Sequence, residues 1–395
     1  MSNVMNTYNR WPISVDYGNG SYIWDTDGNK YLDFTSGIAV NLFGHNYQPL
    51  VEIISEQAAK LMHVSNLFHI PNQEQLADAL IEEAGSGKVF FSNSGAEANE
   101  AAIKLARRYH QKLRGEARYE IITFYKSFHG RTLTTITATA QPKYQEGFQP
   151  LPEGFVYCQF NDLAAVEALI TDKTAAIMFE LIQGEGGVHT IDRNFLLGLQ
   201  ELAKRHGILL IVDEVQTGMY RTGSMFLWQQ FGFRPDIFTL AKGLGGGVPI
   251  GACIATDEVA AAFVPGTHAS TFGGNPLVTA VANRVIIELQ KAEIQQQIKA
   301  NIIELEMQLQ ALKQDFTDVI KEIRGIGLLS GVELVDKLPV AQLATKCREY
   351  GLLVVAAGDN TFRLLPPLNT NKDEIKFAID IIRTCLREIE IETDA

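Results

Sequence analysis

From about Val89 to Lys242 the chain repeats one unit, a short apolar run followed by a glycine-rich turn and a helical segment. The runs are KVFFS, YEIITFY, AAIMFEL, GILLIVDEV and DIFTLAK. Short apolar runs that are separated by helices predict an α/β fold, with a mainly parallel sheet covered by helices on both faces. Ligands bind beyond the carboxyl ends of the strands in such sheets, so the residues directly after each run are the candidate site.

The segments on either side follow a different pattern. YIWDTDGNKYLDF predicts a β-hairpin that turns at Asp27, Gly28 and Asn29, and helical spacing indicates helices over Pro49–Met62 and after Pro71. After residue 285 a long amphipathic stretch leads into EIRGIGLLSGVEL, a helix and GLLVVAAGDNTFRLLPPL. In a chain of 395 residues we therefore expect a large domain over 61–285 and a smaller α+β domain, which is built from 1–60 and 286–395.

Composition excludes several classes of function. Thirty-four basic and 46 acidic residues give a net charge of −12, which argues against a surface for nucleic acid or anionic membrane. The first residues lack the pattern of a secretory signal peptide, in which a basic segment precedes an apolar one. We therefore expect a cytoplasmic protein. The four cysteines lack C-x-x-C spacing and the eight histidines lack H-E-x-x-H spacing, which indicates neither a disulfide framework nor a metal site. We expect the cysteines to be buried as small apolar residues.

Lys242 and Asp213 are the strongest candidates for catalysis. Lys242 follows the apolar run IFTLA, where burial would lower the pKa of its amine and leave it free to attack an aldehyde. Alone it is equally consistent with a loop lysine or a phosphate contact. Asp213 ends the run ILLIVD, and a carboxylate at that depth needs a cationic partner, such as a protonated pyridine nitrogen.

The two nucleotide-binding readings of these motifs fail on their own residues. An apolar run that ends in Asp-Glu also suits a Walker B strand, but the nearest Walker A candidate has Glu82 and Val89 where glycine and a hydroxyl residue are needed. GIGLLSG places Ser330 where a dinucleotide-binding motif needs its last glycine.

Several turns could hold anions or a flat ring. SNSGAEANEAAIK launches a helix, so the N–H groups of Gly95 and Ala96 could bind a phosphate with help from Ser94, although an ordinary capping turn has the same form. SFHGRT supplies Phe128, which could stack on a ring or belong to the core, and Arg131, which could bind a carboxylate.

Two further turns carry polar candidates. HASTFGGNP places Ser270 and Thr271 beside glycines as a second hydroxyl-bearing anion site. Arg363 lies on an apolar strand, where an unpaired guanidinium is costly and a carboxylate is required. Glu185, in the loop QGEGGV, is an internal partner for that arginine or else a solvated loop carboxylate.

Taken in order, the Ser-Gly turn, FHGRT, QGEGG, VDEVQTG, AKGLGGG and STFGGNP resemble the motifs of the class III, fold-type I aminotransferases. The resemblance covers nearly the full length. It implies a seven-stranded sheet in the large domain, pyridoxal 5′-phosphate (PLP) as the cofactor, and a homodimer with shared active sites.

By this resemblance Lys242 would bind PLP as a Schiff base, Asp213 would bind the pyridine nitrogen and Phe128 would pack on the ring. The other cofactor contacts that it implies are Ser94, Gly95 and Ala96, then Glu214, Val215 and Gln216, and Thr271, which would serve the neighbouring subunit.

The resemblance also implies the substrates. It is greatest to the members of arginine biosynthesis that move the ω-amino group of N-acetylornithine to 2-oxoglutarate, while ornithine, succinylornithine and 4-aminobutyrate are alternative donors. Arg131 and Ser270 would contact the carboxylate of the donor, and Glu185 would cover Arg363 until glutamate needs it. Ala269 and Tyr220 replace glycines that are common in the family, which leaves the donor open.

Overall fold

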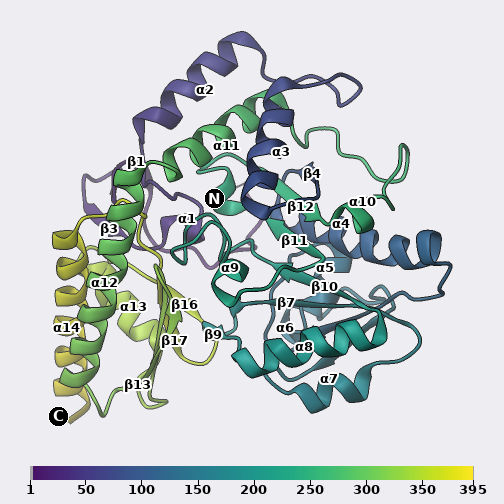
Figure 1. Cartoon of the computed structure of the whole chain (residues 1–395). Coiled ribbons are helices and arrows are strands. Elements are labelled where there is room, and N and C mark those ends of the chain that lie inside the picture. The colour runs from purple at the N-terminus through teal and green to yellow at the C-terminus, as the bar shows by residue number, and fades with distance from the viewer. Residues whose placement is uncertain (1–2, 395) are drawn as a thin grey trace.

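The computed structural model of the protein describes residues 3–394, and side chains as far as residue 389. Its largest element is a seven-stranded sheet in the order β4-β12-β11-β10-β7-β5-β6 (Figure 1). β5, β6, β7, β10 and β11 are parallel, whereas β12 is antiparallel to β4 and β11, so the mainly parallel sheet expected from the sequence is confirmed. The strands are β4 (Lys88–Ser92), β5 (Glu120–Phe124), β6 (Phe155–Cys158), β7 (Thr174–Glu180), β10 (Leu209–Asp213), β11 (Ile237–Leu240) and β12 (Gly251–Ala255).

The central strands are apolar throughout because both faces of the sheet are covered. Every residue of β7 and β10 is buried. Along β10, Ile211 enters the core under α4 (Gly95–Arg108), while its neighbour Val212 enters the core that includes α8 (Arg193–His206). This two-sided burial leaves the carboxyl ends of the strands as the place where polar side chains can gather.

The N-terminal segment folds as the expected hairpin. β1 (Val15–Asn19), β2 (Tyr22–Asp25) and β3 (Lys30–Asp33) are antiparallel neighbours, and the Asp25 carboxylate accepts hydrogen bonds from the Asn29 backbone and side chain. β15 (Leu352–Leu353) adds to β3 in parallel, so a segment far along the chain completes this sheet.

The C-terminal segment forms an antiparallel sheet in the order β13-β14-β17-β16, backed by long helices (Figure 1). The expected amphipathic stretch after residue 285 is two helices, because the chain turns at Gln290 and Lys291 between α11 and α12. The elements are β13 (Ile320–Ile326), β14 (Leu329–Leu334), β16 (Val355–Ala357), β17 (Thr361–Leu364), α11 (Pro276–Leu289), α12 (Ala292–Asp315), α13 (Val340–Glu349) and α14 (Lys372–Asp394).

The remaining elements are short or peripheral. The helices are α1 (Ser36–Ala39), α2 (Gln48–Lys60), α3 (Pro71–Ala84), η1 (Tyr109–Arg114), α5 (Leu133–Ala138), α6 (Pro142–Gln145), α7 (Leu163–Leu169), α9 (Leu227–Phe231), η2 (Lys242–Leu244) and α10 (Asp257–Ala260), and the strands are β8 (Ile182–Gln183) and β9 (His189–Thr190). The expected helices after Pro49 and Pro71 are therefore present. The proposed domain boundaries stay a prediction.

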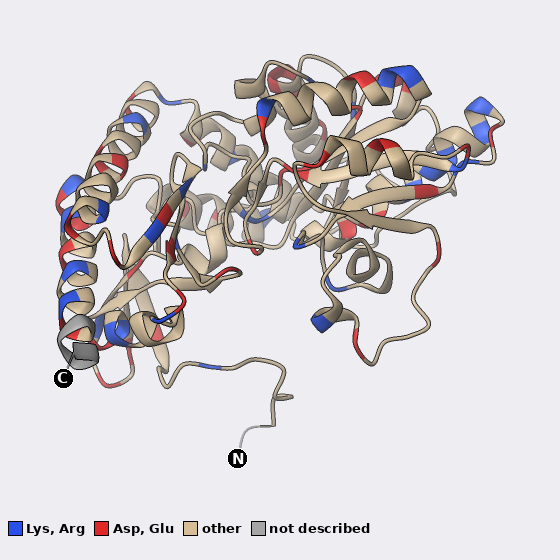
Figure 2. Cartoon of the chain, turned by 90° about the horizontal axis from the view of Figure 1, so that it is seen from below, with Lys and Arg blue, Asp and Glu red and all other residues tan. Residues whose placement is uncertain are grey.

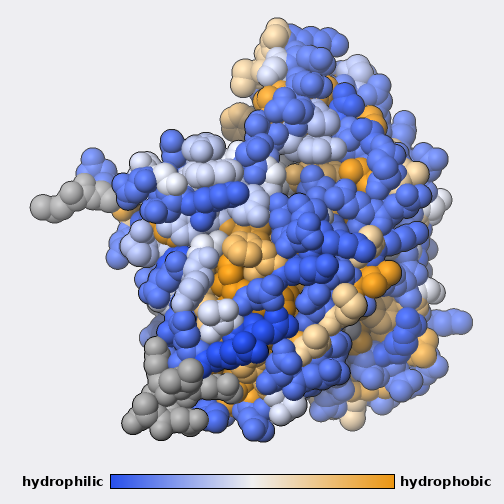
Figure 3. All heavy atoms as spheres, turned by 90° about the vertical axis from the view of Figure 1, so that its left-hand side faces the viewer, coloured by the Kyte–Doolittle hydropathy of each residue, from blue (hydrophilic) through white to orange (hydrophobic). Residues whose placement is uncertain are grey.

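The surface is mixed in charge and mainly hydrophilic. Basic and acidic residues are interspersed along the long helices in Figure 2. The side of the molecule that carries α12 and α14 is mostly hydrophilic, with hydrophobic residues between (Figure 3). All four cysteines are free and buried, as expected. Within residues 3–394, no helix is both long and apolar enough to cross a membrane.

Candidate active site

A cavity of about 440 Å³ lies at the carboxyl ends of β7, β10 and β11. The sequence-predicted residues that line it come from four separate turns, which the sheet brings together. They are Ser94, Gly95, Ala96, Phe128, Arg131, Asp213, Val215, Gln216 and Lys242. Asn99, His129 and Glu180 also line it, and the motifs did not identify them.

Lys242 is the first residue after β11 and Ala241, with a left-handed φ of 44°. Burial lowers the pKa of its amine below the usual value, while Glu185 acts in the opposite direction and Arg363 adds to the lowering. A lowered pKa increases the fraction of free amine, which is the nucleophilic form. The side chain therefore has the chemistry needed for attack on an aldehyde.

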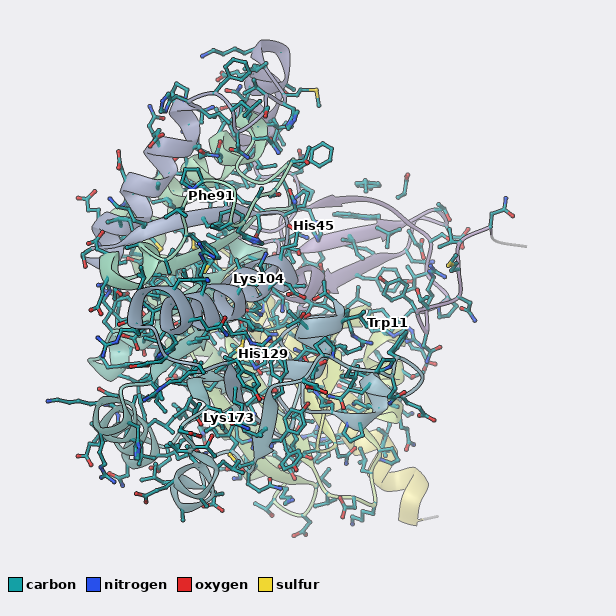
Figure 4. All side chains as sticks on the ribbon, turned by 90° about the vertical axis from the view of Figure 1, so that its right-hand side faces the viewer. Trp11, His45, Phe91, Lys104, His129 and Lys173 are labelled. Atoms are coloured by element: carbon teal, nitrogen blue, oxygen red, sulfur yellow. The ribbon has the colours of Figure 1, made fainter. Side chains whose placement is uncertain are left out.

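Asp213, the last residue of β10, is held in a fixed orientation. Its Oδ2 accepts hydrogen bonds from His129 Nδ1 and Asn99 Nδ2, each at 2.8 Å, and its Oδ1 accepts one from the Val215 N–H at 3.0 Å. Asn99 is held in turn by the Thr239 hydroxyl at 2.7 Å. Figure 4 shows His129 near the middle of the molecule. The carboxylate can therefore accept a proton-bearing partner in the cavity without reorienting.

The opposite wall of the cavity is the start of α4. Ser94 caps this helix, since its Oγ accepts a hydrogen bond from the Glu97 N–H at 3.2 Å. Within the described residues, the Gly95 and Ala96 N–H groups have no protein acceptor. A Cβ at position 95 would lie 2.8 Å from Val215 Cγ1, so glycine allows this close contact. Two free N–H groups at a helix N-terminus suit a phosphate.

Two buried glutamates lie next to Asp213, and only one of them, Glu180, points its side chain into the cavity. Glu180 faces the cavity and accepts hydrogen bonds from the N–H groups of Phe128 at 2.9 Å and Gly184 at 3.3 Å. Burial, and then the charge of Asp213, raises the pKa of Glu180 well above its usual value. Glu214, a predicted cofactor contact, does not line the cavity, because its carboxylate accepts hydrogen bonds from Thr217 and the Trp228 N–H. Burial raises the pKa of Glu214 to about 7.

Arg363 and Glu185 form a bidentate ion pair at the edge of the cavity. Nη1 lies 2.7 Å from Oε1 and Nη2 lies 3.1 Å from Oε2, and Gln216 Oε1 accepts a further hydrogen bond from Nη1 at 3.0 Å. The Arg363 side chain is 1% exposed and that of Glu185 is 22% exposed. Although burial raises it, the pKa of Glu185 is lowered overall by Arg363 and Lys242. Arg363 thus has the carboxylate partner that its burial requires.

Arg131 is exposed and lies over aromatic rings. Its guanidinium carbon is 3.9 Å from the centroid of Tyr144 and 5.7 Å from that of Phe128. Within the described side chains it forms no ion pair, so its charge is available to a carboxylate entering the cavity. Tyr144, which the motifs did not identify, holds the guanidinium in place.

Comparison with known proteins gives the family. The model of "Aminotransferase class-III" matches residues 4–386. An acetylornithine aminotransferase of Thermosynechococcus vestitus is 48% identical over 394 residues, which is 98% of this chain and 95% of the relative. This chain belongs to the class III aminotransferases. It is a PLP-dependent enzyme that transfers an amino group between a small amino donor and a keto acid.

Solved structures agree with the fold of this aminotransferase. An ornithine aminotransferase of Toxoplasma gondii, with PLP partly occupying its active site, superposes with a TM-score of 0.94 at 31% identity and covers 100% of this chain and 94% of its own. An N-acetylornithine aminotransferase of Stenotrophomonas maltophilia gives 0.84 at 34% identity and covers 98% of both chains. The expected fold type is therefore confirmed.

The cavity of this aminotransferase fits PLP on its own chemistry. His129 Nε2 is a buried nitrogen without a partner among the described residues, and its other nitrogen already orients Asp213. Gly130 has φ 137°, and a Cβ there would lie 2.7 Å from Ala96 Cβ, so the Phe128 loop packs directly on the turn at the start of α4. A free amine, a fixed carboxylate and two free N–H groups match the aldehyde, ring nitrogen and phosphate of PLP.

Ser270, Thr271 and Tyr220, like Glu214, Glu185 and Arg363, are not among the residues that line this cavity. Ser270 Oγ accepts hydrogen bonds from Asn93 Nδ2 at 3.2 Å and the Gly273 N–H at 2.9 Å, and Thr271 is exposed. Neither lines the cavity of its own chain. Tyr220, with φ 61°, directs its hydroxyl to Gln295, which donates to it at 2.8 Å.

Proposed function

We propose that the enzyme transfers the ω-amino group of N2-acetyl-L-ornithine to 2-oxoglutarate, giving N-acetyl-L-glutamate 5-semialdehyde and L-glutamate in arginine biosynthesis. The observation that carries the proposal is the buried Arg363, which Glu185 covers at 2.7 Å. The T. vestitus relative, named acetylornithine aminotransferase, supports the choice of donor.

In this proposal Lys242 and Asp213 carry the chemistry. PLP, when bound, supplies an electron sink for the substrate carbon. Lys242 Nζ would hold PLP between turnovers and, once free, would move the proton at the substrate carbon. Asp213 keeps the pyridine nitrogen protonated, because His129 and Asn99 hold its carboxylate in place. Gly95, Ala96 and Ser94 hold the phosphate, and Phe128 packs on the ring.

Glu185 and Arg363 let one cavity accept two kinds of amino compound. With Glu185 in place, the arginine charge is neutralised and does not repel a cationic ω-amino chain. When Glu185 swings aside, Arg363 binds the α-carboxylate of 2-oxoglutarate or glutamate as a bidentate partner. Gln216, which lies between Arg363 and the cavity, contacts the phenolic oxygen of PLP. Arg131 would bind the carboxylate of acetylornithine, and Ser270, which lies outside the cavity of its own chain, would take part only in the cavity of a second subunit.

We also propose that the enzyme is a homodimer with shared active sites. Thr271 and Ser270 lie outside the cavity of their own chain, on an exposed loop whose carbonyls accept hydrogen bonds from Asn66. Large apolar side chains beside this loop are exposed to solvent, with Leu67 at 90% and Phe272 at 60%. A second subunit would cover them and receive Thr271 as a phosphate contact. The cytoplasmic location stays a prediction.

A panel of single-turnover half-reactions tests the donor. The loss of visible absorbance of the lysine-bound cofactor is followed with N-acetylornithine, ornithine, succinylornithine and 4-aminobutyrate. We expect N-acetylornithine to react fastest. A much faster reaction with free ornithine or 4-aminobutyrate would overturn the assignment of donor. Full turnover without added 2-oxoglutarate would instead indicate an aminomutase, in which amino groups are rearranged without exchange.

A further inference from the structure

Three loops of the active site meet on the outer side of the Glu185–Arg363 pair. Lys126 precedes Phe128, His189 follows Glu185, and Asp359 precedes Arg363. Oδ2 of Asp359 accepts hydrogen bonds from Lys126 Nζ and His189 Nε2, each at 2.6 Å. We call Lys126, His189 and Asp359 the Asp359 cluster. One carboxylate oxygen thus links the C-terminal sheet to the loop after β5, through Lys126, and to the β8–β9 hairpin that carries Glu185, through His189.

The Glu185 loop is wedged between the other two loops. The Gly358 N–H donates to the Glu185 carbonyl at 2.9 Å. A Cβ at Gly186 would lie 2.5 Å from the Lys126 carbonyl oxygen, and one at Gly358 would lie 2.8 Å from the Gly186 carbonyl oxygen. The backbone around Glu185 therefore cannot shift unless the three loops separate, so only its side chain is free to swing.

The turn that presents Asp359 is held in a costly backbone conformation. Asp359 and Asn360 have φ values of 54° and 49°, and Lys126 has 66°. Residues other than glycine adopt this left-handed backbone conformation only where neighbouring groups stabilise it. The Asn360 side chain does so here, because its Nδ2 donates to the carbonyls of Val335 at 3.0 Å and Leu338 at 2.9 Å. The carboxylate is thus fixed toward the Glu185 loop.

We propose that Asp359 is a positioning residue that sets the balance of the Glu185 switch and, with it, the preference between ω-amino and α-amino donors. The proposal rests on the proposed function of Glu185 and Arg363. We call the arrangement in which Glu185 covers Arg363 the paired state. It depends on two contacts with the segment 358–363: the Glu185 carbonyl accepts a hydrogen bond from the Gly358 N–H, and the Glu185 carboxylate pairs with Arg363. The hydrogen bonds of the Asp359 cluster hold the segment 358–363 beside the loop that carries Glu185. Binding of a substrate carboxylate by Arg363 needs neither contact, so loosening the cluster weakens the paired state alone.

The test is Asp359→Asn in the full-length holoenzyme. Half-reactions with glutamate and with N-acetylornithine give the ratio of the two kcat/KM values. We expect this ratio to rise about threefold to tenfold in favour of glutamate, as for the loss of two half-exposed ion pairs. Asp336→Asn, which removes an exposed carboxylate just after β14, is the matched control and should leave the ratio unchanged.

Lys126→Met provides a second route to the same result. It should shift the ratio in the same direction by a smaller factor, and the double variant should shift it by less than the product of the two single factors, because both substitutions break one shared contact. If Asp359→Asn does not fold, Lys126→Met and His189→Gln carry the test. An unchanged ratio in folded, cofactor-loaded variants would overturn the proposal.

The two proposals fail in distinguishable ways. If the wild-type enzyme reacts with none of the ω-amino donors, the proposed function is wrong, and the glutamate half-reaction alone then tests the cluster. It should still be faster in Asp359→Asn, because Arg363 is less well covered. If the wild type reacts with N-acetylornithine and Asp359→Asn leaves both half-reactions unchanged, the cluster is merely structural.

Discussion

Replacing Glu185 by glutamine tests how one cavity serves two amino compounds. In the wild type, two charge-assisted hydrogen bonds of 2.7 and 3.1 Å join Glu185 to an arginine that is 1% exposed. Such contacts contribute roughly 1.5–3 kcal/mol, and a neutral amide retains roughly 0.5–1 kcal/mol of this. The substitution therefore weakens the covering of Arg363 by about 1–2 kcal/mol.

That loss has opposite effects on the two half-reactions. 2-Oxoglutarate and glutamate no longer compete with a carboxylate, so their kcat/KM should rise roughly fivefold to thirtyfold, since 1.4 kcal/mol corresponds to tenfold. The ω-amino donor meets an uncovered guanidinium, so its kcat/KM should fall by a similar factor. Stopped-flow half-reactions at fixed pH, with PLP content checked by absorbance, measure both values.

A matched control separates the switch from a general loss of charge. Glu201, exposed on α8, can be replaced by glutamine with no expected change in either half-reaction. If Glu185→Gln changes both half-reactions by the same factor in the same direction, Glu185 does not discriminate between the two kinds of substrate. The reasoning is then refuted.

Further predictions concern stability. Burial raises the pKa of Glu214 from 4.5 to about 7, so the wild type loses stability as the pH rises from about 4.5 to 7, because the carboxyl ionises first in the unfolded chain. Glu214→Gln should therefore gain up to about 3 kcal/mol over wild type across this range in urea titrations, and keep that gain at pH 8. Gly130→Ala, with φ 137° and a Cβ 2.7 Å from Ala96 Cβ, should lose about 1–3 kcal/mol and bind PLP more weakly in thermal and PLP titrations. Arg221, buried, donates to the Leu328 carbonyl at 3.1 Å and to that of Pro366, so Arg221→Lys should lose about 1–3 kcal/mol in urea.

Each of these predictions has a contradicting outcome. A pH-independent difference between Glu214→Gln and wild type would mean that Glu214 is ionised throughout. Wild-type PLP affinity in Gly130→Ala would mean that the Phe128 loop does not support the phosphate-binding turn. Unchanged urea stability in Arg221→Lys would mean that lysine satisfies both carbonyls.

The sequence predicted the sheet and nine of the residues that line the cavity because these residues lie at or near the ends of apolar runs. Asp213 ends one buried strand and Lys242 closely follows another, and parallel strands bring their ends to one edge. Side-chain direction was harder to foresee. Asp213 ends β10 and faces the cavity, whereas the carboxylate of Glu214, the next residue, is turned toward Thr217 and the Trp228 N–H.

Contacts between distant segments were beyond the motifs. His129 stands inside FHGRT and Asn99 inside the α4 motif, but their bonds to Asp213 depend on how α4 and the Phe128 loop pack. The Asp359 cluster joins residues 233 and 170 positions apart, without any pattern in the sequence. The break at Gln290 interrupts a stretch whose amphipathic pattern continues through it.

The central claim is that Lys242 binds PLP and carries the chemistry. Borohydride reduction of the purified holoenzyme, followed by peptide mass spectrometry, tests this most directly. We predict that the visible absorption disappears and that the reduced phosphopyridoxyl group is found on the peptide containing Lys242, with no label in Lys242→Ala. A colourless protein, or a label on another lysine, would contradict the account.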